Sequence, residues 1–237
     1  MATLPKASHP TEEKQMSYAD SEWYVSLTAI WSDAEGFPDL LERIRASGLI
    51  AEHNLPSSFQ AMPVSSWHST IFHFVTACQG TTDAKAQEAS VTSVIDERRG
   101  TLAALIPSPK PLVVEATEFR IDPEVVAVQF RPLNDTLETL RDGLCDSASE
   151  MKLHEVSPHL KPADFSPQSN KNRGNKLYGS IARSRDGKKG RSAGETPALH
   201  SPCLLVWNSY HILVSNRWLT NPSSLQNDAR ITFRVAF

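Results

Sequence analysis

The chain has 237 residues and a formal net charge of −3, from 24 Lys and Arg against 27 Asp and Glu, which fits one globular domain with a full core. Hydrophobic residues at 40% and charged residues at 22% exclude a fibrous or wholly disordered chain, and 16 Pro against 10 Gly predict stiff connections. Cys78, Cys145 and Cys203 are odd in number and far apart, so they predict neither a disulfide framework nor a metal clip. No apolar run approaches the roughly 20 residues of a membrane helix, and the first residues lack a secretory signal. We therefore expect a monomer that is soluble in the cytoplasm, with the nucleus as the alternative.

The first elements are expected after a loose start. Residues 1–19 carry Pro, Ser, Lys and Glu with little to bury and predict a disordered leader, so a single bilobal domain is expected over 20–237. The aromatic and β-branched run Trp23–Trp31 predicts a buried strand. Ser32 and Asp33 then offer an N-cap to an amphipathic helix that Gly48 ends.

Helices and strands continue to alternate in the rest of the chain. Two polar stretches, near 154–176 and 184–201, predict surface loops. The other expected elements are an extended segment over 59–75 interrupted by Pro63, a helix within Asp83–Arg99, two strands over 112–131 joined at Asp122-Pro123, a helix after Asn134 or Asp135 with Leu137, Leu140 and Leu144 on one face, and strands over 176–184, 203–215 and 229–237.

The two halves of the sequence share a weak duplication. In each half an apolar strand leads into an amphipathic helix, and a second strand follows that begins with a ring side chain, a small residue and a hydroxyl residue: His68-Ser69-Thr70-Ile71 and Tyr178-Gly179-Ser180-Ile181. Side chains alternate along a strand, so the ring and the hydroxyl are expected on one face. The pattern predicts an α+β protein whose two pseudo-symmetric lobes, mainly antiparallel sheet with helices, aim both motifs into one central groove.

A histidine followed two residues later by a hydroxyl suits half of a phosphoester site. An imidazole titrates near neutrality and transfers protons, and the hydroxyl hydrogen-bonds a phosphoryl oxygen. A phosphodiester needs two proton handlers, one for the attacking oxygen and one for the leaving oxygen. Two copies of the motif supply them with no metal or other cofactor.

These residues resemble a known family. His68-Ser69-Thr70-Ile71 and Tyr178-Gly179-Ser180-Ile181-Ala182-Arg183 are similar to the two His-x-Thr/Ser-apolar motifs of the two-histidine (2H) phosphoesterases, the group that contains the RNA ligase-like cyclic phosphodiesterases. The second motif of that family is often His-x-Thr-Leu-Ala-Arg, and the resemblance covers about Trp23 to Phe237. It implies a hydrolase that opens a cyclic phosphate, or cleaves a 2′-5′ linkage, on a nucleotide or RNA end. It further implies His68 as the base, Tyr178 at the acid position, and Thr70 and Ser180 as substrate-binding residues.

Tyr178 departs from the family, which has its second histidine there. A phenol with a pKa near 10 is a possible acid and a poor base at neutral pH. Three explanations stay open: Tyr178 replaces the histidine as the acid, another histidine fills the gap, or catalysis is lost while nucleotide or RNA binding remains.

Three other histidines and one arginine are the remaining candidates for the site. His159, in Pro158-His159-Leu160-Lys161, is the rival second histidine. His211 lacks a following hydroxyl and is expected in the core or at an edge strand. His73 and Arg183 follow the motif rings by five residues, an odd spacing that predicts the opposite strand face and structural roles.

Charge is polarised although its total is small. From Lys171 to Arg191 there are eight Lys and Arg against one acid, a local +7 that leaves −10 for the rest of the chain. This segment is either a solvated loop pair or a contact for an anionic ligand such as RNA. Gly190-Arg191-Ser192-Ala193-Gly194 matches the Gly-x-Ser-x-Gly of serine hydrolases, but it lacks the strand and helix that a nucleophile elbow needs. No His, Cys or Glu spacing predicts a metal site.

Overall fold

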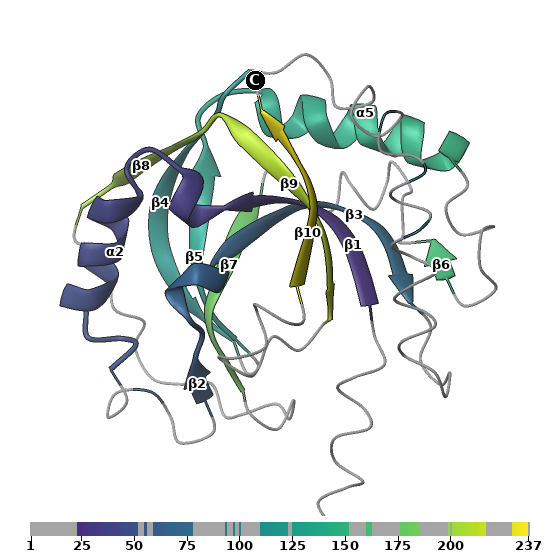
Figure 1. Cartoon of the computed structure of the whole chain (residues 1–237). Helices are drawn as coiled ribbons and strands as arrows, with labels where there is room; N and C mark the ends of the chain where they lie inside the picture. Colours follow the sequence, from purple (N-terminus) through teal and green to yellow (C-terminus); the bar gives the residue numbers. More distant parts are fainter. Residues whose placement is uncertain are drawn as a thin grey trace, which may run out of the picture.

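Two antiparallel sheets of five strands each dominate the part of the chain that the structure describes (Figure 1). The structure is a computed structural model that describes residues 23–51, 55, 59–77, 93, 97, 100, 110–122, 125–151, 160–162, 176–184, 199, 201–216 and 229–236. The first sheet has the strand order β10-β9-β1-β3-β6 and the second the order β2-β7-β5-β4-β8. The predicted α+β class with mainly antiparallel sheet is therefore confirmed. The expected leader, His159 and most of the helix predicted within Asp83–Arg99 lie outside the described residues.

The strands of the first sheet are β1 (Trp23–Ile30), β3 (His68–Ala77), β6 (Leu160–Pro162), β9 (Ser209–Asn216) and β10 (Ala229–Ala236). Those of the second are β2 (Phe59–Ala61), β4 (Leu112–Ile121), β5 (Val125–Pro132), β7 (Leu177–Ser184) and β8 (Cys203–Trp207). Helix α2 (Phe37–Ala46) contacts β8, and helix α5 (Thr136–Met151) contacts β3 and β4 (Figure 1). Each helix thus follows a strand of one sheet and also packs against the other sheet.

The predicted duplication corresponds to a repeated topology. The unit β1-α2-β3 matches β5-α5-β7, and each unit has a short strand just before its motif strand. These short strands cross over: β2 of the first half pairs with β7, and β6 of the second half pairs with β3. The two lobes are therefore tied together by exchanged strands.

Two predicted boundaries differ from the observed ones. The turn after β1 is a 3₁₀ turn, η1 (Trp31–Asp33), and α2 starts only after Gly36. Gly36 has a φ of 84°, and a Cβ atom added there would lie 2.1 Å from the Leu204 carbonyl oxygen. Both features require glycine at this position. The predicted strand over 203–215 is two strands, because the chain leaves the second sheet at Trp207 and enters the first at Ser209.

An aromatic cluster fills the space between the sheets. The Trp31 ring packs edge to face on Trp67 at 5.5 Å and on Phe130 at 5.1 Å, and Phe130 packs similarly on Trp207 at 6.0 Å. All four side chains are buried. The cluster joins β1 and the start of β3 to β5 and β8, so it sets how the two sheets meet.

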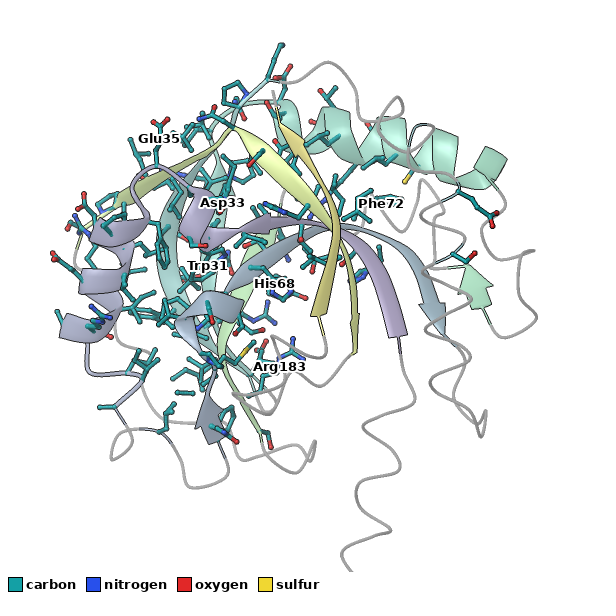
Figure 2. The ribbon with its side chains drawn as sticks, viewed as in Figure 1. Trp31, Asp33, Glu35, His68, Phe72 and Arg183 are labelled. Carbon is teal, nitrogen blue, oxygen red and sulfur yellow. The ribbon has the colours of Figure 1, made fainter. Side chains whose placement is uncertain are left out.

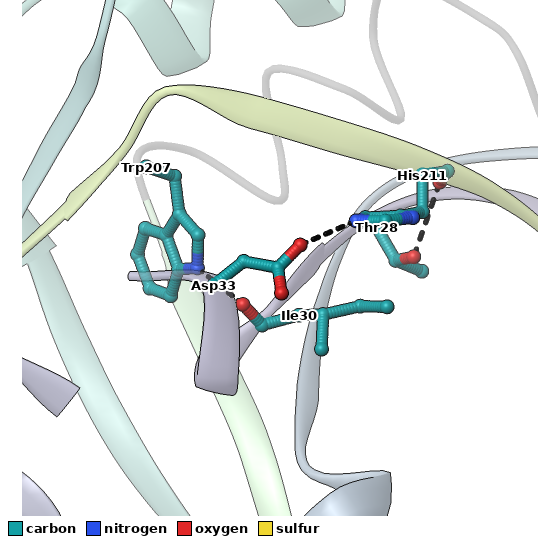
Figure 3. A network of polar contacts seen from close by, with 5 residues as sticks. All are labelled: Thr28, Ile30, Asp33, Trp207 and His211. Carbon is teal, nitrogen blue, oxygen red and sulfur yellow. Dashed lines mark hydrogen bonds and ion pairs between the residues drawn. The ribbon is translucent and has the colours of Figure 1, made fainter. Parts of the chain in front are cut away.

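Polar contacts hold the turn after β1 against the β8–β9 corner (Figure 3). The Trp207 indole donates to the Ile30 carbonyl at 2.7 Å, and the Thr28 hydroxyl donates to the His211 carbonyl at 3.1 Å. His211 Nε2 lies 2.6 Å from Asp33 Oδ2, and the histidine is buried on a central strand. His211 therefore lies in the core, which is one of the two places expected for it, and not at a sheet edge.

Candidate functional site

Both motif strands carry a β-bulge at the same place. Thr28 of β1 pairs with Thr70 and Leu27 pairs with Phe72, which leaves Ile71 as an extra residue in β3. Ala127 of β5 pairs with Ser180 and Val126 pairs with Ala182, which leaves Ile181 extra in β7. In each half the bulge comes directly after the motif hydroxyl, so the duplication extends to an irregularity of the backbone.

The motif strands β3 and β7 contact each other along their edges. Among the described residues, His68–Thr70 pair with β1 alone and Leu177–Ser180 pair with β5 alone. A methyl group added at Gly179 would lie 2.6 Å from the His68 carbonyl oxygen. We call the contact of His68–Ile71 with Lys176–Ser180 the seam (Figure 2). The seam lies between the two sheets, because β3 belongs to the first sheet and β7 to the second.

Trp31 defines one side of the seam. Its indole donates to the Ser69 hydroxyl at 2.9 Å, and a methyl group at Gly179 would lie 2.4 Å from its Cζ2 atom. The middle residues of both motifs therefore point toward the same buried ring. Since strand neighbours alternate, the ring and hydroxyl residues of both motifs leave the seam on the side away from Trp31.

The four predicted site residues differ in exposure on that side. His68 and Thr70 are partly buried, Ser180 is 9% exposed, and Tyr178 is 54% exposed. Solvent exposure is therefore low at the histidine and the serine and high at the phenol. Trp67 and Phe72, which flank the first motif, are buried in the core.

The His68 ring has a defined tautomer when neutral. Its Nδ1 lies 2.8 Å from the Ser66 carbonyl oxygen, which only accepts, so Nδ1 carries the hydrogen and Nε2 carries the lone pair. Burial lowers the pKa of His68 below 6.5; the Ser66 carbonyl opposes this, and the positive charge of Arg183 lowers it further. The imidazole is therefore neutral at neutral pH, with Nε2 ready to accept a proton.

The structure corrects the faces predicted for His73 and Arg183. Arg183 pairs with Val125, two residues from the partner of Ser180, so Ser180 and Arg183 share a face although their spacing is odd. His73 pairs with Ser26, two residues from the partner of Thr70, and likewise shares its face. The bulges cause this, because one extra residue reverses the alternation. The electrostatic effect of Arg183 on His68 agrees with this placement; both residues are labelled in Figure 2.

The position of β6 bears on the rival second histidine. His159 itself is not among the described residues, but Leu160–Pro162, which comes next in the chain, pairs with Val75–Ala77 at the far end of β3 from His68. Its counterpart in the first half is β2, which precedes the first motif. By topology, the strand equivalent to β3 in the second half is β7, which carries Tyr178.

A metal centre is not found in the described part of the chain, where His, Cys, Asp and Glu do not cluster in threes. None of the described helices is long and apolar enough to cross a membrane.

Comparison with known proteins rests on structures. No family model matches the chain, and no curated protein has a similar sequence. TT0787 of Thermus thermophilus superposes with a TM-score of 0.52 at 10% identity, covering 90% of this chain and 97% of that one. A structure described as a phosphoesterase gives 0.50 at 14% identity over 90% and 98% of the two chains. LigT of E. coli, crystallised with ATP, gives 0.50 at 13% identity over 91% and 98%. The chain therefore has the α+β fold of LigT and of this phosphoesterase over nearly its whole length.

Proposed function

We propose that the chain is a metal-independent phosphodiesterase that opens a cyclic phosphate, or cleaves a 2′-5′ linkage, on a nucleotide or RNA end. One observation carries the proposal: Ser69 and Gly179 both face Trp31. By strand alternation, His68, Thr70, Tyr178 and Ser180 then lie on the side away from it. Two proton handlers and two hydroxyls on one side of two abutting strands suit a single phosphorus atom held between them.

The roles follow from the chemistry of each group. For a cyclic phosphate, Nε2 of His68 takes a proton from the attacking water while the oxygen of that water bonds to phosphorus. The bond from phosphorus to the leaving oxygen breaks, and the Tyr178 phenol donates a proton to that oxygen. Because Tyr178 is 54% exposed, solvent returns its proton and removes the one on His68. One water is consumed, and a phosphomonoester is formed.

Binding of the anion falls to the remaining groups. Thr70 and Ser180 donate to phosphoryl oxygens, and Arg183, turned to the same face by its bulge, supplies positive charge. LigT was crystallised with ATP, which supports a nucleotide as the ligand class. The basic segment Lys171–Arg191 would extend contact along an RNA chain.

A second candidate is a nucleotide- or RNA-binding protein without activity. Tyr178 favours it, since a phenol replaces the histidine that the resemblance implies. Both candidates share the ligand and differ in turnover.

The test uses a 2′,3′-cyclic nucleotide in the presence of a chelator. The wild type is expected to turn it over, His68→Ala is expected to bind the product without turnover, and Glu118→Gln, on an exposed face of β4, serves as the control that retains activity. If the wild type binds the nucleotide without turning it over, the chain is the binding protein of the second proposal and not an enzyme. Neither binding nor turnover, with a nucleotide or a cyclic-phosphate RNA end, would refute both.

A further inference from the structure

Helix α5 carries a buried arginine on its apolar face. Leu137, Leu140 and Leu144 are buried on that face, and Arg141, between them, is 6% exposed. The Arg141 Nε donates to the Ile71 carbonyl oxygen at 3.1 Å, and one terminal nitrogen donates to the Lys176 carbonyl oxygen at 3.0 Å. One side chain thus joins the helix to both sides of the seam.

The two carbonyls belong to the elements that present the site. Ile71 is the bulged residue directly after Thr70, and Lys176 lies two residues before Tyr178. β3 and β7 lie in different sheets, and no backbone ladder joins them in the described part of the chain. At the seam itself, away from the exchanged strands β2 and β6, the spacing of the motifs therefore depends on side chains.

A guanidinium group suits this task. Its donors form a rigid planar fork, so two acceptors bound to one group stay at a set separation. An ammonium group places its charge similarly but has no such fork. Burial adds to the constraint at Ile71, because the carbonyl of this buried residue would be left without water to replace a lost donor, whereas the bond to the Lys176 carbonyl is only partly buried.

We propose that Arg141 is a positioning residue: its hydrogen bonds to the Ile71 and Lys176 carbonyls set the distance of His68 and Thr70 from Tyr178 and Ser180. The proposal rests on the proposed function for its effect on turnover. Its effect on geometry stands apart from turnover, because the seam also brings Arg183 of the second sheet within electrostatic reach of His68 of the first.

Arg141→Lys tests the proposal, since lysine keeps the charge and the stem and loses the fork. Positioning predicts that kcat falls on the order of tenfold to a hundredfold with a smaller change in KM. It also predicts that the pKa of the His68 ring, followed by NMR, rises toward its ordinary value as Arg183 and the shelter of the seam move away. Arg141→Gln, which lacks the charge and the second fork donor, is the second variant and is expected to behave the same way.

The control is Ile44→Val, in the buried face of α2, which lowers stability by removing a buried methyl group and leaves the Arg141 hydrogen bonds in place. It is expected to leave both kcat and the His68 titration unchanged. If the folded Arg141 variants match this control in both readouts, Arg141 is only a structural residue and the proposal is wrong. If the wild type shows no turnover, the proposed function fails, and the His68 titration still decides the role of Arg141.

Discussion

Replacing Gly179 by alanine is the most direct test of how the two sheets meet. The added methyl group would lie 2.4 Å from Trp31 Cζ2 and 2.6 Å from the His68 carbonyl oxygen. Neither neighbour yields easily. Trp31 is fully buried and hydrogen-bonded to Ser69, and the carbonyl belongs to the backbone of β3. The strands must therefore separate at the seam.

The size of the effect follows from these distances. Ordinary van der Waals contact begins near 3.4 Å, so β7 has to move by about 1 Å. Forcing an extra carbon into a packed core costs about 1–3 kcal/mol, which exceeds the roughly 0.4–1 kcal/mol that alanine returns through the unfolded chain. We expect the free energy of unfolding to fall by about 1–2 kcal/mol. On the proposed function, these groups act on one phosphate, and a displacement of this size between them lowers kcat on the order of a hundredfold.

Urea denaturation measures the first quantity, and turnover of a 2′,3′-cyclic nucleotide at saturating substrate measures the second. Gly100→Ala is the matched control, because a methyl group there has nothing within 4 Å and the residue is helical. It should be neutral or slightly stabilising. If Gly179→Ala unfolds at the wild-type urea concentration and keeps wild-type kcat, the strands are not in contact there, and the convergence of the two motifs is refuted.

Four further predictions concern single groups. Tyr178→Phe removes the proposed acid and should lower kcat at least about tenfold. It should not change stability, because the side chain is 54% exposed. Tyr178→His should keep or raise kcat, and equal activity of Tyr178→Phe and wild type would exclude the phenol as the acid. His68 must be neutral to act as the base, and burial and the charge of Arg183 lower its pKa, so kcat/KM should fall only as the pH drops through a value below 6.5. Arg183→Gln should move this acidic fall in kcat/KM to higher pH. A fall that stays at the same pH would contradict the placement of Arg183. The lowered pKa of His68 also predicts that the free energy of unfolding falls as the pH drops below 6.5, because His68 then binds a proton in the unfolded chain but not yet in the folded one. His68→Asn should make this fall in the free energy of unfolding smaller. Asp33→Asn weakens the contact with buried His211 and should cost about 1–2 kcal/mol of unfolding free energy at unchanged kcat; a large fall in kcat would instead place this pair in the site.

Much of the fold could be predicted from sequence, because its strands and helices have strong local signals. The alternation in Leu112–Ile121 and the leucine spacing in α5 are such signals, and both elements are observed where they were predicted. Which sheet a strand joins is a nonlocal property. The run from Cys203 to Ser215 is largely apolar, so its pattern does not predict that Asn208 separates a strand of the second sheet from a strand of the first.

The candidate site shows the same limit at finer scale. The ring and hydroxyl positions follow from simple alternation over two residues, which holds up to Thr70 and Ser180. Beyond them, Ile71 and Ile181 look like any strand isoleucine, and only the register reveals that each is an extra residue. Alternation counted across them puts His73 and Arg183 on the wrong face. Arg141 did leave a signal, since an arginine lies within the leucine face of α5, but its acceptors come from another part of the chain.

The small middle residue of each motif has a physical explanation in the same geometry. Ser69 and Gly179 both face Trp31, one close enough to accept its hydrogen bond and the other with no room for a methyl group. A larger side chain at either position would push the strands apart, and with them the groups that we propose to bind one phosphate. The bulge then turns the chain so that the fifth residue after the ring returns to the same side, which in the second half brings a positive charge toward His68. The four positions of each motif therefore act as one unit. The ring and the hydroxyl residue face the proposed substrate, the small residue lets the two strands approach, and the extra residue of the bulge orients the residues that follow.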